Sequence, residues 1–220
     1  MSISIQQLSP EENAFFELLN NVGCLTTLQA KTMLVKYLFC SDLQASRILQ
    51  NLANHQYISF CANNTCITAG SRVLKFAPKL DPRVIRGMHL CIDMVDSLDN
   101  MRFTHIPSDN SNLIFLAQGS LYKVIEIHAD ETYKINTMQQ LYIDALALQK
   151  KLNGTGANPF SYVTIFTIPS SENKEEMLHL FEESCISYPA AIAYFNVDGY
   201  AETRIMIYIS SIYKIPKGTA

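Results

Sequence analysis

Glu126 and His128 are the first residues of the chain whose types and spacing suggest chemistry. They lie two positions apart in the segment 121–129, which the residue pattern predicts to be a strand, so their side chains share one face. A histidine in such a place can ligate a metal ion, although it is a poor permanent cation at pH 7. The alternative is that Glu126, His128, Asp130 and Glu131 form the polar end of a strand that enters a loop.

Cys61 and Cys66 form a second pair, because they flank Asn63-Asn64, a dipeptide that tolerates the positive φ of a tight hairpin turn. A two-residue loop places the cysteines opposite each other in a non-hydrogen-bonded pair, with Cα atoms about 4.5 Å apart. That separation admits a disulfide, so a redox-sensitive hairpin is one interpretation. We prefer the interpretation that both thiols are reduced. Met1–Pro10 carries neither the basic region nor the apolar core of an export signal, and disulfides form mainly in exported proteins.

Common catalytic motifs are absent from the sequence. There is no P-loop of the form GxxxxGK[ST], no GxSxG elbow, and no HxH or HExxH among the five histidines. Gly154 and Gly156 follow a predicted helix, whereas a dinucleotide site needs its glycines after a strand. The six cysteines contain no CxxC pair, which argues against a zinc finger. We therefore expect no cofactor, unless a magnesium-dependent activity described below applies.

The first third of the chain carries the signals of three short helices and a β-hairpin. The helix starts are marked by Ser9 with Pro10 and Glu12, by Thr26 or Thr27, and by Ser41. Strands at 57–60 and 66–68 follow on either side of the Asn63-Asn64 turn. This order, over about residues 9–75, resembles the winged helix–turn–helix superfamily in the segment "CLTTLQAKTMLVKYLFCSDLQASRILQNLANHQYISFCANNTCITAG".

The resemblance implies that the third helix enters the major groove of duplex DNA. Arginine can bond to guanine and asparagine or glutamine to adenine through paired hydrogen bonds. The expected DNA-binding residues are Gln44, Arg47, Gln50, Asn51, Asn54 and Arg72. The alternative is that these are the polar residues of any amphipathic helix, in a domain that docks protein.

The rest of the chain predicts a second domain. Residues 71–80 are the expected linker between a domain at 1–75 and one at 81–220, in an α+β, two-domain fold. The order of predicted elements in the second domain is α-β-β-β-α-β-α-β-β. A strand–helix–strand crossover at 121–168 implies a parallel pair within a mixed sheet. The Asp198-Gly199 dipeptide predicts a terminal hairpin with apolar residues on both faces, which favours a homodimer.

This order resembles the restriction-endonuclease-like (PD-(D/E)xK) fold, and a winged helix followed by such a domain resembles replication-relaxation-type proteins of mobile elements. The resemblance implies Asp109 and Glu126 as magnesium ligands, and Asp109, Glu126 and His128 as the catalytic residues if the domain is active. His128 stands where that family has its lysine, so the family's chemistry is incomplete here. We therefore lean towards a non-enzymatic role, with a nuclease-like scaffold.

Charge and composition limit the function classes. The chain has 48% hydrophobic and 17% charged residues, which excludes a disordered protein. No apolar run reaches the ~18 residues that span a bilayer, so we expect no membrane contact and a cytoplasmic location. The net charge of −3 divides into +2 for residues 1–80 and −5 for residues 81–220.

The leading hypothesis is a DNA-binding accessory or regulatory protein whose acidic second domain binds a protein partner or a second copy. The alternatives are an atypical magnesium-dependent nuclease and a protein-interaction module that does not bind DNA.

Overall fold

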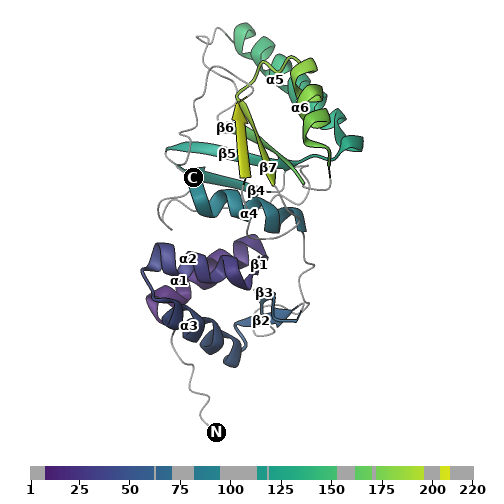
Figure 1. Cartoon of the computed structure of the whole chain (residues 1–220). Coiled ribbons are helices and arrows are strands. Elements are labelled where there is room, and N and C mark those ends of the chain that lie inside the picture. Colours follow the sequence, from purple (N-terminus) through teal and green to yellow (C-terminus); the bar gives the residue numbers. More distant parts are fainter. Residues whose placement is uncertain are drawn as a thin grey trace. The chain divides into compact units, whose positions relative to one another are not determined.

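A computed structural model shows the chain as two units, each described here by itself (Figure 1). The described residues are 8–61, 63–70, 82–94, 113–117, 119–152, 162–169, 172–195 and 204–208. The units are Met1–His105 and Ile106–Ala220. Within the described residues the architecture is α+β, with six α-helices and two sheets, one of which is mixed. The expected fold class is confirmed at that level.

Three helices open the first unit, and each begins with the same arrangement of side chains. The helices are α1 (Pro10–Val22), α2 (Thr27–Leu38) and α3 (Asp42–Asn54). In each, the hydroxyl of the N-cap residue accepts a hydrogen bond from the backbone three residues later, and the side chain there accepts one in return. The three pairs are Ser9–Glu12, Thr26–Gln29 and Ser41–Gln44. These capping boxes explain why the helices start where the sequence predicts.

A three-stranded antiparallel sheet completes the core of the first unit. Its strands are β1 (Cys24–Thr26), β2 (Ile58–Cys61) and β3 (Cys66–Ala69), in the order β1-β3-β2. Asn63 and Asn64 have φ values of 56° and 66°, which confirms the predicted tight turn between β2 and β3. Strand β1 has only three residues and is not predicted from the sequence. The largest fully buried side chains between helices and sheet are Phe15, Leu19, Leu25, Met33, Leu34, Leu49, Leu52 and Ile58.

Helix α4 (Pro82–Met94) belongs to the first unit, whereas the sequence analysis placed it in a second domain at 81–220. Gln29 Nε2 donates to the carbonyl of Ile85 at 2.7 Å, and the Lys36 ammonium and Tyr37 hydroxyl both donate to the carbonyl of Ile92. Ile92 lies in the last turn of α4, where backbone carbonyls have no partner inside the helix. Side chains of α2 supply those partners, so the boundary between the units lies after α4.

The second unit is built on a five-stranded mixed sheet. The strands are β4 (Leu113–Ala117), β5 (Ser120–Glu126), β6 (Tyr162–Ile168), β7 (Ala190–Phe195) and β8 (Arg204–Tyr208), in sequential order across the sheet. The β5–β6 and β6–β7 pairs are parallel, and the two outer pairs are antiparallel. The predicted parallel pair within a mixed sheet is therefore confirmed. The expected strand at 101–106, the linker at 71–80 and the Asp198-Gly199 turn lie outside the described residues.

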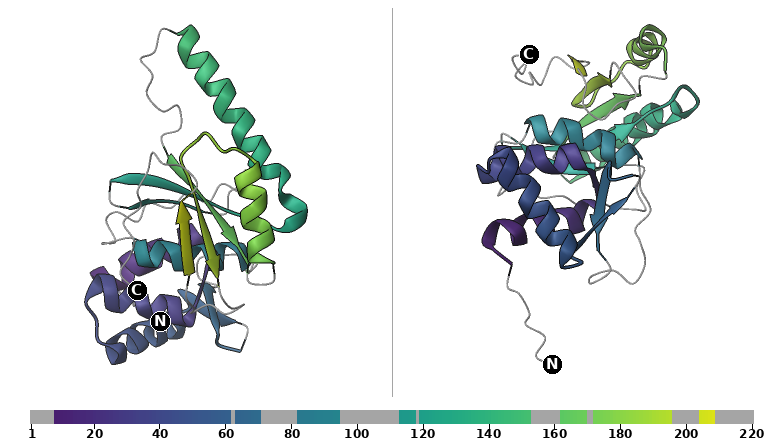
Figure 2. Two further views of the ribbon diagram at one scale, coloured as in Figure 1. Left: turned by 45° about the horizontal axis from the view of Figure 1, so that its top comes forward. Right: turned by 60° about the horizontal axis from the view of Figure 1, so that its bottom comes forward.

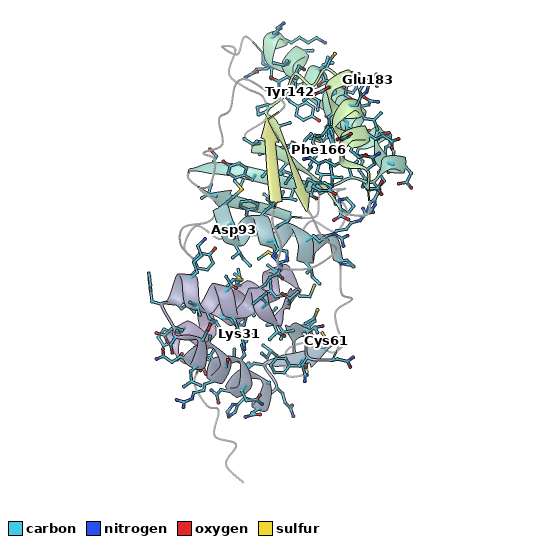
Figure 3. The ribbon with its side chains drawn as sticks, in the orientation of Figure 1. Lys31, Cys61, Asp93, Tyr142, Phe166 and Glu183 are labelled. Atoms are coloured by element: carbon cyan, nitrogen blue, oxygen red, sulfur yellow. The ribbon has the colours of Figure 1, made fainter. Side chains whose placement is uncertain are left out.

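Helices α5 (Tyr133–Lys151) and α6 (Lys174–Glu183) cover the same face of this sheet (Figure 2). Phe166 of β6 meets Phe181 of α6 with ring centroids 5.1 Å apart, and Tyr142 of α5 meets Tyr188 with ring centroids 6.0 Å apart. Figure 3 shows Tyr142 and Phe166 pointing into this layer between helices and sheet. Sequential parallel strands with right-handed crossovers place both helices on one side.

Helix α5 starts at Tyr133, one turn before Thr137. Thr137 and Gln140 resemble a capping box, but Thr137 Oγ1 donates to the carbonyl of Tyr133 and Gln140 Nε2 donates to Asp144 Oδ1. Both side chains therefore make bonds inside the helix rather than at its start. None of the described helices is long and apolar enough to cross a membrane.

Candidate functional site

The outer face of α3 carries most of the residues that the sequence analysis proposed for DNA binding. The helix buries Ala45, Leu49 and Leu52 against the core. Its opposite face exposes four of the proposed residues and leaves a fifth half-buried. The exposed residues are Gln44, Arg47, Gln50 and Asn54, and the half-buried one is Asn51. Arg72 lies outside the described residues.

Several of these side chains already have hydrogen-bond partners. Gln44 Oε1 accepts from the backbone N–H of Ser41 at 2.8 Å, so this side chain closes the N-terminus of α3. Gln50 Nε2 donates to Asn54 Oδ1 at 3.0 Å along the exposed face. Asn51 Nδ2 donates to Glu12 of α1 at 2.5 Å. Asn51 thus fixes α3 against α1 rather than standing free to contact a base.

Arg47 differs from its neighbours because, among the described residues, its guanidinium makes no hydrogen bond, ion pair or ring contact. It lies beside a shallow open depression of about 450 Å³. The remaining lining residues are Glu12, Ile48, Gln50, Asn51 and Asn54. An exposed guanidinium with five unused donors can bind a phosphate or the edge of a guanine.

One carboxylate limits the positive potential of this depression. Glu12 is 9% exposed, and its two oxygens accept hydrogen bonds from the Ser9 backbone N–H and from Asn51. The whole first unit contains nine basic and eight acidic side chains, so its net charge is small. The electrostatic attraction of this face for a polyanion is therefore local, and it centres on Arg47.

A second candidate site lies at the carboxyl ends of the parallel strands β5 and β6. Glu126 is the last residue of β5, His128 follows it, and Glu172 follows β6. The carboxyl ends of parallel strands meet at one edge of a sheet, where ligands of open α/β sheets commonly bind. The predicted proximity of Glu126 and His128 is thus realised, and Glu172 joins them.

The imidazole of His128 bridges two carboxylates. Its Nε2 lies 3.2 Å from Glu126 Oε1, and its Nδ1 lies 3.1 Å from Glu172 Oε1. Glu126 is fully buried, while the side chains of His128 and Glu172 are 29% and 20% exposed. For both contacts to be hydrogen bonds, the imidazole must carry two protons or one carboxyl must be protonated. The two contacts hold the imidazole ring of His128 between the carboxylates of Glu126 and Glu172.

A buried ammonium completes this cluster. Lys134, in the first turn of α5, is 4% exposed; its Nζ lies 2.7 Å from Glu131 Oε1 and donates to the backbone carbonyl of Glu126 at 3.3 Å. The other oxygen of Glu131 accepts from the backbone N–H of His128 at 3.3 Å. The cluster therefore ties the end of β5 to the first turn of α5 and, through Glu172, to the segment that precedes α6.

The cluster does not form a metal site by itself. Among the described residues, no group of three His, Cys, Asp or Glu side chains is placed to hold a metal ion. Asp109, the proposed partner of Glu126 in metal binding and catalysis, lies outside the described residues. Magnesium prefers an octahedral set of oxygen ligands, whereas the carboxylates here face an imidazole and an ammonium. The described residues therefore do not by themselves supply the ligands of a magnesium ion.

Lys134 and Glu172 are not among the site residues that the sequence predicts. Glu172 lies 44 residues from His128 in the sequence, and patterns of neighbouring residues do not predict contacts between residues so far apart. Lys134 had a detectable signal, since Lys134, Ile135, Met138 and Tyr142 form one helical stripe once the helix begins at Tyr133. Thr137 and Gln140, which resemble a capping box, suggest a later start for this helix, and Lys134 then lies outside it.

The predicted opposition of Cys61 and Cys66 is confirmed by the register of β2 and β3, and both are free thiols. Cys61 lies near the end of the hairpin (Figure 3) and is half-buried. Burial raises the pKa of the Cys61 thiol, and the neighbouring Cys66 raises that pKa further. A thiol with a raised pKa is a poor nucleophile at neutral pH, which fits two reduced thiols better than a fast redox sensor.

No protein-family model matches the sequence, and no curated protein matches it either.

Proposed function

We propose that the first unit is a winged helix–turn–helix domain that binds duplex DNA through α3, and that the chain is a DNA-binding accessory or regulatory protein. Three helices followed by a β-hairpin support the domain type, together with the antiparallel sheet of order β1-β3-β2. The observation that carries the proposal is the exposed guanidinium of Arg47, which has no partner among the described residues of this chain.

The dimensions of α3 suit this role. Its 13 residues span about 20 Å, and the major groove of B-DNA, about 12 Å wide, admits an α-helix. Arg47, Gln50 and Asn54 are spaced by three and four residues, so they project from one face. In this arrangement Arg47 contacts guanine or phosphate, and the Gln50 and Asn54 amides contact neighbouring base edges or water.

The small number of cations predicts weak binding. Each phosphate neutralised by a cation contributes about −0.9 to the slope of log affinity against log salt on B-DNA. With Arg47 as the only cation lining the depression, we expect a shallow salt dependence and modest affinity. The acidic second unit, with eight basic and twelve acidic side chains, adds no general attraction for DNA.

The experiment is a selection from a random duplex pool with the full chain, followed by fluorescence anisotropy of the enriched duplex at about 50 and 200 mM salt. Arg47→Ala should weaken binding about tenfold. Lys150→Ala removes an exposed cation of the second unit and serves as the matched control, which should leave binding unchanged. Failure to enrich any duplex, or equal affinities of the wild type and Arg47→Ala, would refute the proposal and favour the protein-docking alternative.

Glu12 offers a complementary test of opposite sign. Glu12→Gln keeps a side chain that can close the capping box of α1 but removes the negative charge beside Arg47. We expect DNA affinity to rise by about twofold to fivefold, in line with the loss of one unfavourable charge near the surface. Glu17→Gln, on the exposed side of the same helix, removes an equal charge away from the depression and should change affinity less.

A second candidate function, nucleic-acid hydrolysis by the second unit, is favoured by the contact of His128 with Glu126. Incubation of the protein with supercoiled plasmid DNA and magnesium or manganese tests it. Nicking that is lost in both Glu126→Gln and His128→Ala would support hydrolysis at this cluster. Intact plasmid, or nicking that persists in both variants, would remove the candidate.

A further inference from the structure

Helix α5 presents two different apolar faces. Ile135, Met138 and Tyr142 are buried in the core of the second unit, and Leu146 packs against it. On a neighbouring face, Leu141, Leu148 and Leu152 are 53%, 59% and 74% exposed. Figure 2 shows α5 as a long helix of this unit. Large leucines exposed in a row on one helix mark a surface that gains stability from a partner.

The exposed leucines follow the spacing of a coiled-coil seam. With the half-buried Ala145 they lie at positions 141, 145, 148 and 152, separated by four, three and four residues. This alternation repeats every 3.5 residues on average and keeps the four side chains, here called the leucine stripe, on one face over about 17 Å. The polar residues that border the stripe on its outer side are Asp144 and Lys151, both exposed.

We propose that the leucine stripe packs antiparallel against the leucine stripe of a second copy of this chain. In that register Leu141 lies opposite Leu152 of the second copy, and Ala145 lies opposite Leu148 of the second copy. Each layer of the seam then contains two apolar side chains, and the small Ala145 allows the helices to approach closely.

The charges select a second copy in this orientation. In this antiparallel register, Asp144 of each copy lies opposite Lys151 of the other copy. The pairing therefore forms two ion pairs, which are related by the two-fold symmetry axis of the dimer. A parallel pairing would place Asp144 beside Gln149 instead and would lose both ion pairs. The same border of the leucine stripe carries one acid and one base, so it can pair with the same border of a second copy. An interface in which both copies use the same surface requires this self-complementarity.

The contact is short, so the dimer should be weak. A seam of four residues per helix buries less than the 1,200–2,000 Å² usual for stable complexes. We expect a dissociation constant on the order of 10–100 µM. The inference rests on α5 alone and does not depend on DNA binding. If DNA binding also holds, a dimer supplies two α3 helices for a two-fold-related DNA site.

The test is sedimentation equilibrium of the full chain from about 1 to 500 µM, a range that brackets the expected dissociation constant. The wild type should shift from the 24.8 kDa monomer towards twice that mass. Leu148→Glu should weaken association about tenfold or more. Circular dichroism checks that the variant stays folded, which its exposure predicts. A monomer throughout, or a dimer unaffected by Leu148→Glu, would overturn the proposal.

Charge reversal tests the antiparallel register. Asp144→Lys and Lys151→Asp should each weaken self-association about fivefold, because each places like charges opposite each other. A mixture of the two variants should associate at least as well as the wild type, because both cross pairs then join opposite charges. Lys150→Asp, on the other side of the helix, is the matched control and should dimerise normally. A mixture that associates no better than either variant alone would overturn the antiparallel register.

Discussion

The two units use their charged side chains in opposite ways. In the first unit, Arg47 is exposed and has no partner among the described residues, so its full binding capacity is available to another molecule. In the second unit, Glu126 and Lys134 are buried, and their partners are backbone and side-chain groups of the same cluster. A charged group is therefore left available to another molecule in the first unit, whereas in the second unit charged groups organise the interior. Removal of a charge should accordingly affect binding in the first unit and stability in the second.

The largest effect is expected from Glu126→Ala. This substitution removes a fully buried carboxylate and leaves the Nε2 atom of His128 without its partner, at a cost of about 3 kcal/mol in the free energy of unfolding of the second unit. Hydrogen exchange followed by mass spectrometry reports each unit separately. Peptides of the first unit should keep their protection. Glu172→Ala, at a 20% exposed position, should cost less than about 1 kcal/mol. If the second unit keeps its protection against hydrogen exchange in Glu126→Ala, the proposed difference between the two units is contradicted.

Alkaline pH should weaken the first unit before the second. Burial raises the pKa of Cys91 well above 9.0, against a smaller opposing effect of Lys36, and burial raises the pKa of Tyr188 above 10.0, with Tyr162 adding to it. Above those pH values the unfolded chain loses the proton and the folded chain keeps it. Stability is therefore complete below pH 9 and falls by about 1.4 kcal/mol per pH unit for each group.

Urea unfolding, followed by circular dichroism between pH 8 and pH 11, measures this loss. Cys91→Ala should abolish most of the loss that begins near pH 9, and Tyr188→Phe should abolish most of the loss that begins near pH 10. A loss that begins at the same pH in the wild type and in Cys91→Ala would contradict the assigned order.

Helix caps are a feature that both units share, so they should behave alike. Ser41→Ala removes the hydroxyl that accepts from the backbone of Gln44 and should cost about 1 kcal/mol in the first unit. Asn173→Ala removes the N-cap of α6 and should cost a similar amount in the second unit. Hydrogen exchange should place each loss in its own unit. A loss that spreads equally over both units would show that they unfold together.

The smallest effect on stability is expected from Arg47→Ala. Because the guanidinium is exposed and makes no contact among the described residues, the free energy of unfolding of the first unit should change by less than about 0.5 kcal/mol. The same variant should lose about tenfold in DNA affinity. A destabilisation comparable with that of Glu126→Ala would remove the contrast between the units.

Local signals in the sequence predict much of the fold. Ser9, Thr26 and Ser41 are confirmed as N-caps because capping depends on residues three positions apart. The opposition of Cys61 and Cys66 follows from a two-residue turn, which sets the register by itself. The strand–helix order of the second unit follows from changes in hydrophobic period.

Contacts between distant residues were not predictable in the same way. The apolar stripe of α4 predicts burial but does not name the surface that buries it, so its place beside α2 was missed. The bond from Asn51 to Glu12 joins residues 39 positions apart and changes a candidate base contact into an internal one. The contact of His128 with Glu172 is of the same kind. Such contacts can be identified only from the three-dimensional structure, because the hydrophobic periodicity of the sequence indicates only which face of a helix or strand is apolar.

The hydrogen bonds between α2 and α4 decide where the chain can be cut. A fragment that ends at residue 75, the boundary expected from sequence, would leave Gln29 Nε2 and the Tyr37 hydroxyl without their acceptors at Ile85 and Ile92. Gln29 is 2% exposed and Tyr37 is 7% exposed, so water would have to enter the unit to replace those acceptors. The shortest fragment that keeps the outer face of α3 on a complete scaffold therefore extends past Met94, and tests of the proposed DNA binding with a fragment should begin there.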